Sequence, residues 1–223
     1  MTEGYLEHNP LDGIVFKPPK DPPIEPYQRE HKKKFLAVLD HDWKVAKTPR
    51  QRMLAARDKA IVCLFFESGL RLQELADLCL RDIDINEHRV VVRFGKQGKS
   101  RLSGFGPQTR KALWRYLSLR PEGARDGRLW LTEELRPLSK RGIQEIFRRL
   151  KRDAGLQHVR GLVHKCRHSF ATTLLEHTGG MKTCQTLLGH STLRMTQRYT
   201  EYVQAEHALK YYDGGGPLDW MKD

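Results

Sequence analysis

The chain has 223 residues, of which 39% are hydrophobic and 30% charged. This length fits one or two domains of about 100–200 residues each, and the composition excludes a collagen-like or low-complexity chain. Forty Lys and Arg against 27 Asp and Glu give a net charge of +13, which favours a polyanionic partner, nucleic acid first and an anionic membrane surface second.

Membrane and disulfide signals are weak in this sequence. The longest apolar stretch, residues 60–66, is far shorter than the roughly 18 residues that a membrane helix needs, and no signal peptide is visible. The four cysteines, which have no paired short spacing, fit reduced thiols better than a disulfide framework or a zinc site: Cys63, Cys79, Cys166 and Cys184.

The hydrophobic periodicity predicts a mainly helical chain after a proline-rich opening. Residues 1–26 contain three Pro-Pro or Asn-Pro pairs and predict a linker from an upstream segment. Ser68-Gly69 ends the second predicted helix, and Ser139 is expected to cap a later one. The predicted helices cover approximately residues 25–39, 50–67, 73–78, 107–119, 139–153, 166–177, 181–187 and 192–208.

The strand signals are few and lie close together. The β-branched run at 88–94 predicts a strand, 95–100 a hairpin tip and 101–105 the returning strand. A further short strand is predicted at 128–131. The fold class is therefore α+β, mainly helical, with a small antiparallel sheet built around a hairpin.

Two predicted helices carry an apolar side. Leu113, Trp114, Tyr116 and Leu117 are expected to pack in the 107–119 helix. The 139–153 helix has an apolar stripe at positions 143, 146, 147, 150 and 154, and its other faces are basic. Those basic side chains fit a solvated surface or a contact with DNA.

Four separated segments carry residues suited to phosphoryl transfer. Residue 199 follows His190 by nine positions. The segments are 68–75 with Arg71, 95–99 with Lys96, 164–172 with His164 and Arg167, and 187–190 with His190, followed by Tyr199. Taken in this order, they resemble the catalytic domain of the tyrosine site-specific recombinases, the phage integrase family, over residues 27–210.

The chemistry of these residue types agrees with the resemblance. A Tyr phenol can conserve the energy of a phosphodiester in a covalent bond, and Arg presents paired donors to phosphoryl oxygens while keeping its charge. The resemblance implies six catalytic residues: Tyr199 as nucleophile, Arg71 and Arg167 as oxygen ligands, Lys96 as acid for the leaving 5′ oxygen, His164 as base and His190 as a hydrogen-bond donor.

The resemblance also implies supporting residues and partners. Glu74 would orient the cations, and DNA contacts are expected from Lys99, Arg101, Lys140 and Arg141. Lys99 competes with Lys96 for the catalytic role. The family works on double-stranded DNA as a tetramer, so a monomer is expected without DNA. Neither a metal, nor a nucleotide cofactor, nor a membrane is expected, and the location is the cytoplasm of a bacterium, at the nucleoid.

The same resemblance divides the chain. Residues 1–26 would be a linker and remnant of an upstream core-binding domain, 27–210 the catalytic domain, and 211–223 a tail that docks on a neighbouring subunit. Cys166 stands where the family usually has Leu, and a buried Cys behaves as a small hydrophobe.

Some of these residues also have explanations other than a catalytic role. Arg71 could cap the preceding helix or pair with Glu67, and Tyr199 could be a packing residue. His164, Cys166 and His168 suggest a metal site but lack the four-ligand spacing of zinc. The alternative functions are a type IB topoisomerase, a non-catalytic DNA-binding module and a metal-dependent nuclease.

Overall fold

The structure is a computed structural model that describes residues 25–93, 100–121, 127–178, 180–190 and 192–209. Lys96, Lys99, the proposed linker up to residue 24 and the tail from residue 210 lie outside the described residues. The elements are α1 (Arg29–Val45), α2 (Pro49–Ser68), α3 (Leu72–Asp77), the short 3₁₀ helix η1 (Leu80–Asp82), β1 (Ile83–Asp84), β2 (Arg89–Val92), β3 (Arg101–Gly104), α4 (Pro107–Leu119), α5 (Lys140–Asp153), α6 (His164–Thr178), α7 (Met181–Leu188) and α8 (Arg194–Leu209).

The helix boundaries follow the local signals in the sequence. Thr48 accepts a hydrogen bond from the Gln51 amide at 3.1 Å, which caps α2, and Pro49 occupies the first turn. Gly69 ends α2 in the left-handed conformation, with φ +60°. Ser139 caps α5 by accepting from the Gly142 amide. The predictions for Gly69 and Ser139 are confirmed, whereas the cap at Thr48 was not predicted.

The sheet is small and antiparallel, in the order β1-β2-β3. In its register Val90 pairs with both Ile83 of β1 and Ser103 of β3. The predicted antiparallel pairing of the two strands is confirmed, whereas residues 95–99 of the predicted tip lie outside the described residues, and β1 was not predicted. The strand predicted at 128–131 is wrong: only isolated bridges, Cys79 to Arg128 and Leu131 to Pro137, form there.

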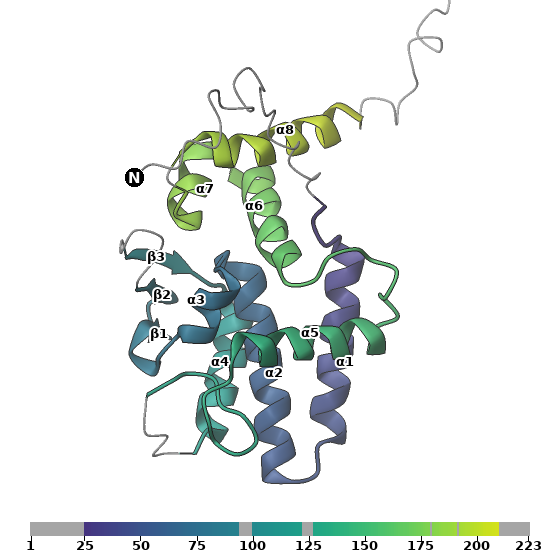
Figure 1. Cartoon of the computed structure of the whole chain (residues 1–223), viewed down its shortest axis with the longest axis vertical. Coiled ribbons are helices and arrows are strands. Elements are labelled where there is room, and N and C mark those ends of the chain that lie inside the picture. The colour runs from purple at the N-terminus through teal and green to yellow at the C-terminus, as the bar shows by residue number, and fades with distance from the viewer. Residues whose placement is uncertain (1–24, 94–99, 122–126, 179, 191, 210–223) are drawn as a thin grey trace, which may run out of the picture.

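Two hydrophobic clusters meet at α6. The main cluster packs α1, α2, α4 and α5 together, with Phe35, Phe65 and Phe147 at its centre. A smaller cluster joins α6 to α7 and α8. Cys166 belongs to the first cluster and Leu175 to the second, so α6 connects them. Figure 1 shows α6, α7 and α8 at one end of the molecule, beyond the long helices α1 and α2.

The apolar stripe of α5 is confirmed, because Ile143, Ile146, Phe147 and Leu150 are buried. The packing prediction for Trp114 is wrong, since 64% of that side chain is exposed. α4 packs on α2 through Ala112, Leu113 and Tyr116, which turns Trp114 to the outer side. Within the described residues, no helix combines the length and apolarity required to cross a membrane.

Candidate functional site

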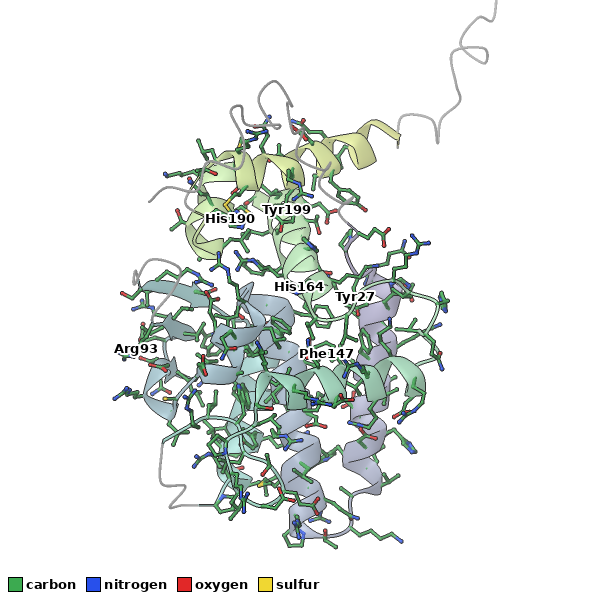
Figure 2. The ribbon with its side chains drawn as sticks, in the orientation of Figure 1. Tyr27, Arg93, Phe147, His164, His190 and Tyr199 are labelled. Atoms are coloured by element: carbon green, nitrogen blue, oxygen red, sulfur yellow. The ribbon has the colours of Figure 1, made fainter. Side chains whose placement is uncertain are left out.

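The predicted residues come together from four elements. Arg71 is the N-cap of α3, Arg167 lies in the first turn of α6, His190 follows α7, and Tyr199 lies in α8. Figure 2 shows His190 and Tyr199 side by side where α7 and α8 meet, with His164 at the start of α6. The fold thus assembles one cationic site from residues that are far apart in the sequence.

Backbone carbonyls hold Arg167 in place. Its guanidinium donates to the carbonyl of Gly69 and, at 2.8 Å, to the carbonyl of Leu188. The first carbonyl belongs to the residue that ends α2, and the second to the end of α7. Arg167 therefore ties α6 to two other elements, and neither bond neutralises its charge.

Glu74 joins two further cations. Its carboxylate accepts from the Arg71 guanidinium at 2.9 Å and from the Arg71 amide at 2.7 Å. Arg101 on β3 donates to both oxygens of the same carboxylate, at 2.8 and 2.7 Å. Burial alone would raise the pKa of Glu74, but the hydrogen bonds from Arg101 and from the Arg71 amide lower it to about 2. Glu74 is therefore ionised and binds both arginines.

Arg101 occupies a different place from the one expected. It was expected to contact DNA, yet only 10% of its side chain is exposed. Besides Glu74 it binds the carbonyl of Leu187 at 3.0 Å. Gly189 makes room for it, because a Cβ at that position would lie 2.7 Å from the Arg101 Cδ. This placement favours a role in connecting β3, α3 and α7 over a phosphate contact.

The alternative reading of Arg71 is not supported. Glu67, its suggested partner, accepts instead from the Gly106 amide at 2.7 Å. Arg71 follows α2 and pairs with Glu74 on α3, with 32% of its side chain exposed. Its guanidinium is therefore accessible to a ligand.

The three arginines influence one another and their neighbours. Burial, together with the charges of Arg71 and Arg101, lowers the pKa of Arg167 to about 10. Burial and the same three guanidiniums lower the pKa of His190 to about 4. The His190 imidazole is therefore neutral at pH 7, and its Nδ1 lies 2.9 Å from the Thr196 hydroxyl oxygen. This positive field surrounds a region suited to an anion.

Tyr199 lies between two imidazoles. Its ring stacks on His190 with centroids 6.1 Å apart, and its hydroxyl oxygen lies 3.0 Å from Nδ1 of His168. Burial raises the pKa of the phenol, and the charge of Arg167 opposes that rise. His168 was considered in the sequence only as a candidate metal ligand. Its position directly after Arg167, four residues after His164, was the available signal for its place here.

His164 is exposed at the first residue of α6, and its side chain makes no hydrogen bond to another described residue. Cys166 is fully buried in the main core, where burial raises the pKa of its thiol, whereas His168 turns toward Tyr199. These three residues thus point to different surroundings. In the described part of the chain, no group of three or more His, Cys, Asp or Glu side chains is arranged to hold a metal ion.

The other DNA contacts predicted within the described residues are exposed. Lys140 and Arg141 form the first turn of α5. Figure 1 shows α5 beginning beside α3, the helix whose N-cap is Arg71, and the two helices are in contact. The pair can therefore extend the positive surface around the site.

Comparison with known proteins identifies relatives over most of the chain. Residues 42–206 match the phage integrase family. The tyrosine recombinase XerC of Shewanella sp. strain ANA-3 is 34% identical over 218 residues, which cover 97% of this chain and 69% of the relative. The crystal structure of the XerA recombinase is 26% identical, with a TM-score of 0.69 and coverage of 87% of this chain and 66% of that one. The XerH recombinase bound to palindromic difH substrate has the same fold, with 21% identity, a TM-score of 0.69 and coverage of 85% and 53%.

Gly69 provides a test of the packing between the end of α2 and α6. A Cβ at Gly69 would lie 2.4 Å from the Phe170 side chain. The backbone of this residue also has φ +60°, a left-handed conformation that is unfavourable for any residue with a Cβ. Gly155 has φ +66° with nothing within 4 Å, so Gly155→Ala should cost only about 1–2 kcal/mol of backbone strain. Gly69→Ala should cost about 1–3 kcal/mol more, because the packed Phe170 ring must move to make room for the Cβ. Urea unfolding of both variants measures the difference, and equal losses would contradict the tight packing.

Proposed function

Because the chain belongs to the phage integrase family, whose members are tyrosine recombinases, we propose that Tyr199 is the nucleophile that cuts one DNA strand in site-specific recombination. The observation that supports this most directly is the buried Tyr199 phenol beside Arg167 and Arg71. Among the described residues, Glu74 is the one carboxylate that pairs with the arginines of this site, through Arg71 and Arg101. Such a site favours an anion next to a hydroxyl nucleophile, which is the arrangement that phosphodiester cleavage requires.

The proposed reaction conserves the phosphodiester bond energy. The Tyr199 oxygen attacks phosphorus, the bond to the 5′ oxygen breaks, and a 3′-phosphotyrosyl link with a free 5′-hydroxyl remains. The 5′-hydroxyl then attacks the 3′-phosphotyrosyl link formed on the partner duplex, which joins the two DNA strands and releases the tyrosine of that link. Arg71 and Arg167 stabilise the charge that develops on the non-bridging oxygens, since fixed guanidinium forks need little reorganisation. His190, with Nδ1 engaged by Thr196, can offer Nε2 to the same phosphate.

Two proton-transfer roles rest on the resemblance. Lys96, or its rival Lys99, would donate a proton to the leaving 5′ oxygen from the hairpin tip, outside the described residues. His164, exposed at the start of α6, would take part as the base. Arg93, at the described end of the hairpin, pairs with the buried Asp82, so the strand that leads to the tip is anchored.

The expected partner is double-stranded DNA. The net charge of +13 and the exposed Lys140 and Arg141 support phosphate contacts. The related XerH structure carries a DNA substrate. We also propose that the protein acts in the cytoplasm at the nucleoid, where a DNA recombinase meets its substrate.

Covalent trapping tests the nucleophile. The probe is a pool of duplexes with randomised sequence around a nick, which lets the short 5′-hydroxyl fragment diffuse away after cleavage. The wild-type chain should form an SDS-resistant adduct. Tyr199→Phe removes only the reacting oxygen and keeps the ring on His190, so it should abolish the adduct and change duplex binding by less than about twofold. Tyr202→Phe, on the same helix, serves as the control and should still form the adduct.

Other outcomes of this assay separate the alternatives. An adduct formed by Tyr199→Phe would show that another residue attacks. Binding without any adduct from the wild type would favour the non-catalytic module. Relaxation of supercoils without recombinant product would favour a topoisomerase, and loss of cleavage in EDTA would favour a nuclease.

Salt dependence tests the basic surface. Each neutralised phosphate should contribute about −0.9 to the slope of log K against log salt concentration. Lys140→Ala and Arg141→Ala should each make the slope about one unit less steep on a non-specific duplex. Arg50→Ala is the control, because Arg50 pairs with Glu133 at 2.8 Å at the start of α2. Fluorescence anisotropy measures the slopes, and equal slopes in all variants would place the contacts elsewhere.

We propose in addition that the chain assembles as a tetramer on DNA through its tail. A cavity of about 600 Å³ opens between α1, α2 and α6, and its walls are largely apolar. Its lining includes Leu36, Phe66, Phe105, Phe170 and Leu174. The tail contains Leu218 and Trp220, which have the size and polarity to fill such a cavity in a neighbouring subunit.

Sedimentation of DNA complexes tests the tail contact. Trp220→Asp should shift the complexes from tetramer toward monomer or dimer, because a carboxylate cannot enter an apolar cavity without a large desolvation cost. Trp114→Asp is the matched control, since Trp114 is exposed on α4. A tetramer retained by the Trp220 variant would exclude this docking mode.

A further inference from the structure

His168 touches the atom that performs the proposed reaction. Its Nδ1 lies 3.0 Å from the Tyr199 hydroxyl oxygen, and the two rings lie 5.6 Å apart. The side chain of His164, to which the resemblance gives the base role, is exposed and makes no hydrogen bond to another described residue. The phenol of Tyr199 therefore contacts a residue outside the six expected catalytic ones.

The surroundings of this contact are fixed on both sides. On α6, His168 directly follows Arg167, which the carbonyls of Gly69 and Leu188 hold. On α8, Thr196 lies one turn before Tyr199 and contacts His190 at 2.9 Å. The His190 imidazole thus fixes the start of α8, and the His168 imidazole contacts the phenol. The Tyr199 hydroxyl therefore has a defined direction.

The protonation states indicate which atom donates. Burial, and then the charges of His164, Arg198, Arg167 and Lys165, lowers the pKa of His168 to about 4. Burial raises the pKa of the phenol. At pH 7 a neutral imidazole therefore accepts the phenol proton in a hydrogen bond, with its own proton on Nε2. A base this weak does not remove that proton, so the contact orients the phenol and leaves it protonated.

We propose that His168 is a positioning residue that holds the Tyr199 hydroxyl for attack by accepting its hydrogen bond, while the oxygen lone pairs remain directed to the phosphate beside Arg167. This rests on the proposed role of Tyr199. Holding the reacting oxygen in one direction matters because a small misplacement of a nucleophile can cost up to about 100-fold in rate.

Substitution of His168 tests the proposal by single-turnover cleavage on a nicked duplex selected from the pool above. His168→Leu should lower the cleavage rate constant about 10–100-fold and change duplex affinity by less than about twofold. His168→Asn presents an amide oxygen near the position of Nδ1 and should restore the rate to within about fivefold of the wild type. His41→Leu, an exposed histidine on α1, is the matched control. Equal losses in the Leu and Asn variants would overturn positioning in favour of proton removal by His168.

A second arm bypasses the tyrosine. In a Tyr199→Phe background, hydrogen peroxide at high concentration serves as the nucleophile: its oxygen bonds to phosphorus and the 5′ oxygen leaves with a proton. Adding His168→Leu should leave this peroxide-driven cleavage unchanged, because His168 acts through the phenol alone. A further loss in the double variant would assign His168 to the phosphate and overturn the proposal.

The third arm needs no activity. In protein labelled with ¹³C at the tyrosine ring carbon that bears the hydroxyl, His168→Leu should shift the Tyr199 resonance, identified by its absence in Tyr199→Phe. The resonances of Tyr27 and Tyr116, which donate to backbone carbonyls, should stay in place. An unmoved Tyr199 resonance would overturn the contact itself. A wild type without adduct would instead refute the proposed function, so the two failures are distinguishable.

Discussion

The ion pairs of Glu74 are the interaction on which the arrangement of the site depends. A single carboxylate, 8% exposed, holds Arg71 of the α2–α3 junction and Arg101 of β3. Arg101 also reaches the last turn of α7. The α2–α3 junction, β3 and α7 are therefore connected through the Glu74 carboxylate and the Arg101 side chain. Hydrogen bonds between charged groups of this kind are shorter and stronger than those between neutral groups. Without Glu74, two buried or half-buried guanidiniums would repel each other and Arg167.

Burial, together with the neighbouring cations, leaves both imidazoles of the site uncharged. His168 and His190 have pKa values lowered to about 4, so both imidazoles act as neutral hydrogen-bonding groups at pH 7. The positive charge of the site therefore rests on arginine, which keeps it at any physiological pH. In the proposed reaction this separates two tasks: the guanidiniums would attract and stabilise an anion, and the imidazoles would orient hydroxyl groups. Tyr199 lies where the two sets meet.

Much of the fold and of the site could be predicted from local signals. Gly69 and Ser139 marked helix boundaries because capping is decided within three or four residues. The order of Arg71, Arg167, His190 and Tyr199 indicated a shared site, which the fold assembles. The role of Arg101 could not be predicted, since it depends on a carboxylate 27 residues away and on space left by Gly189. The exposure of Trp114 likewise depends on which side of α4 meets α2. The contact of His168 required the relative placement of α6 and α8.

The positive charge of Arg167, which is partly buried beside two other arginines, has a consequence for folding. A base whose pKa falls to about 10 on folding, from 12.5, opposes folding at every pH where the unfolded chain keeps it protonated, and this cost is fully present below about pH 10. Burial and the charges of Arg71 and Arg101 thus make the charged Arg167 unfavourable for the stability of the fold, and in the proposed reaction the phosphate would offset this cost. Natural selection for cleavage and selection for thermal stability act in opposite directions at these positions. The most stable versions of this fold should therefore not be those that cut DNA best.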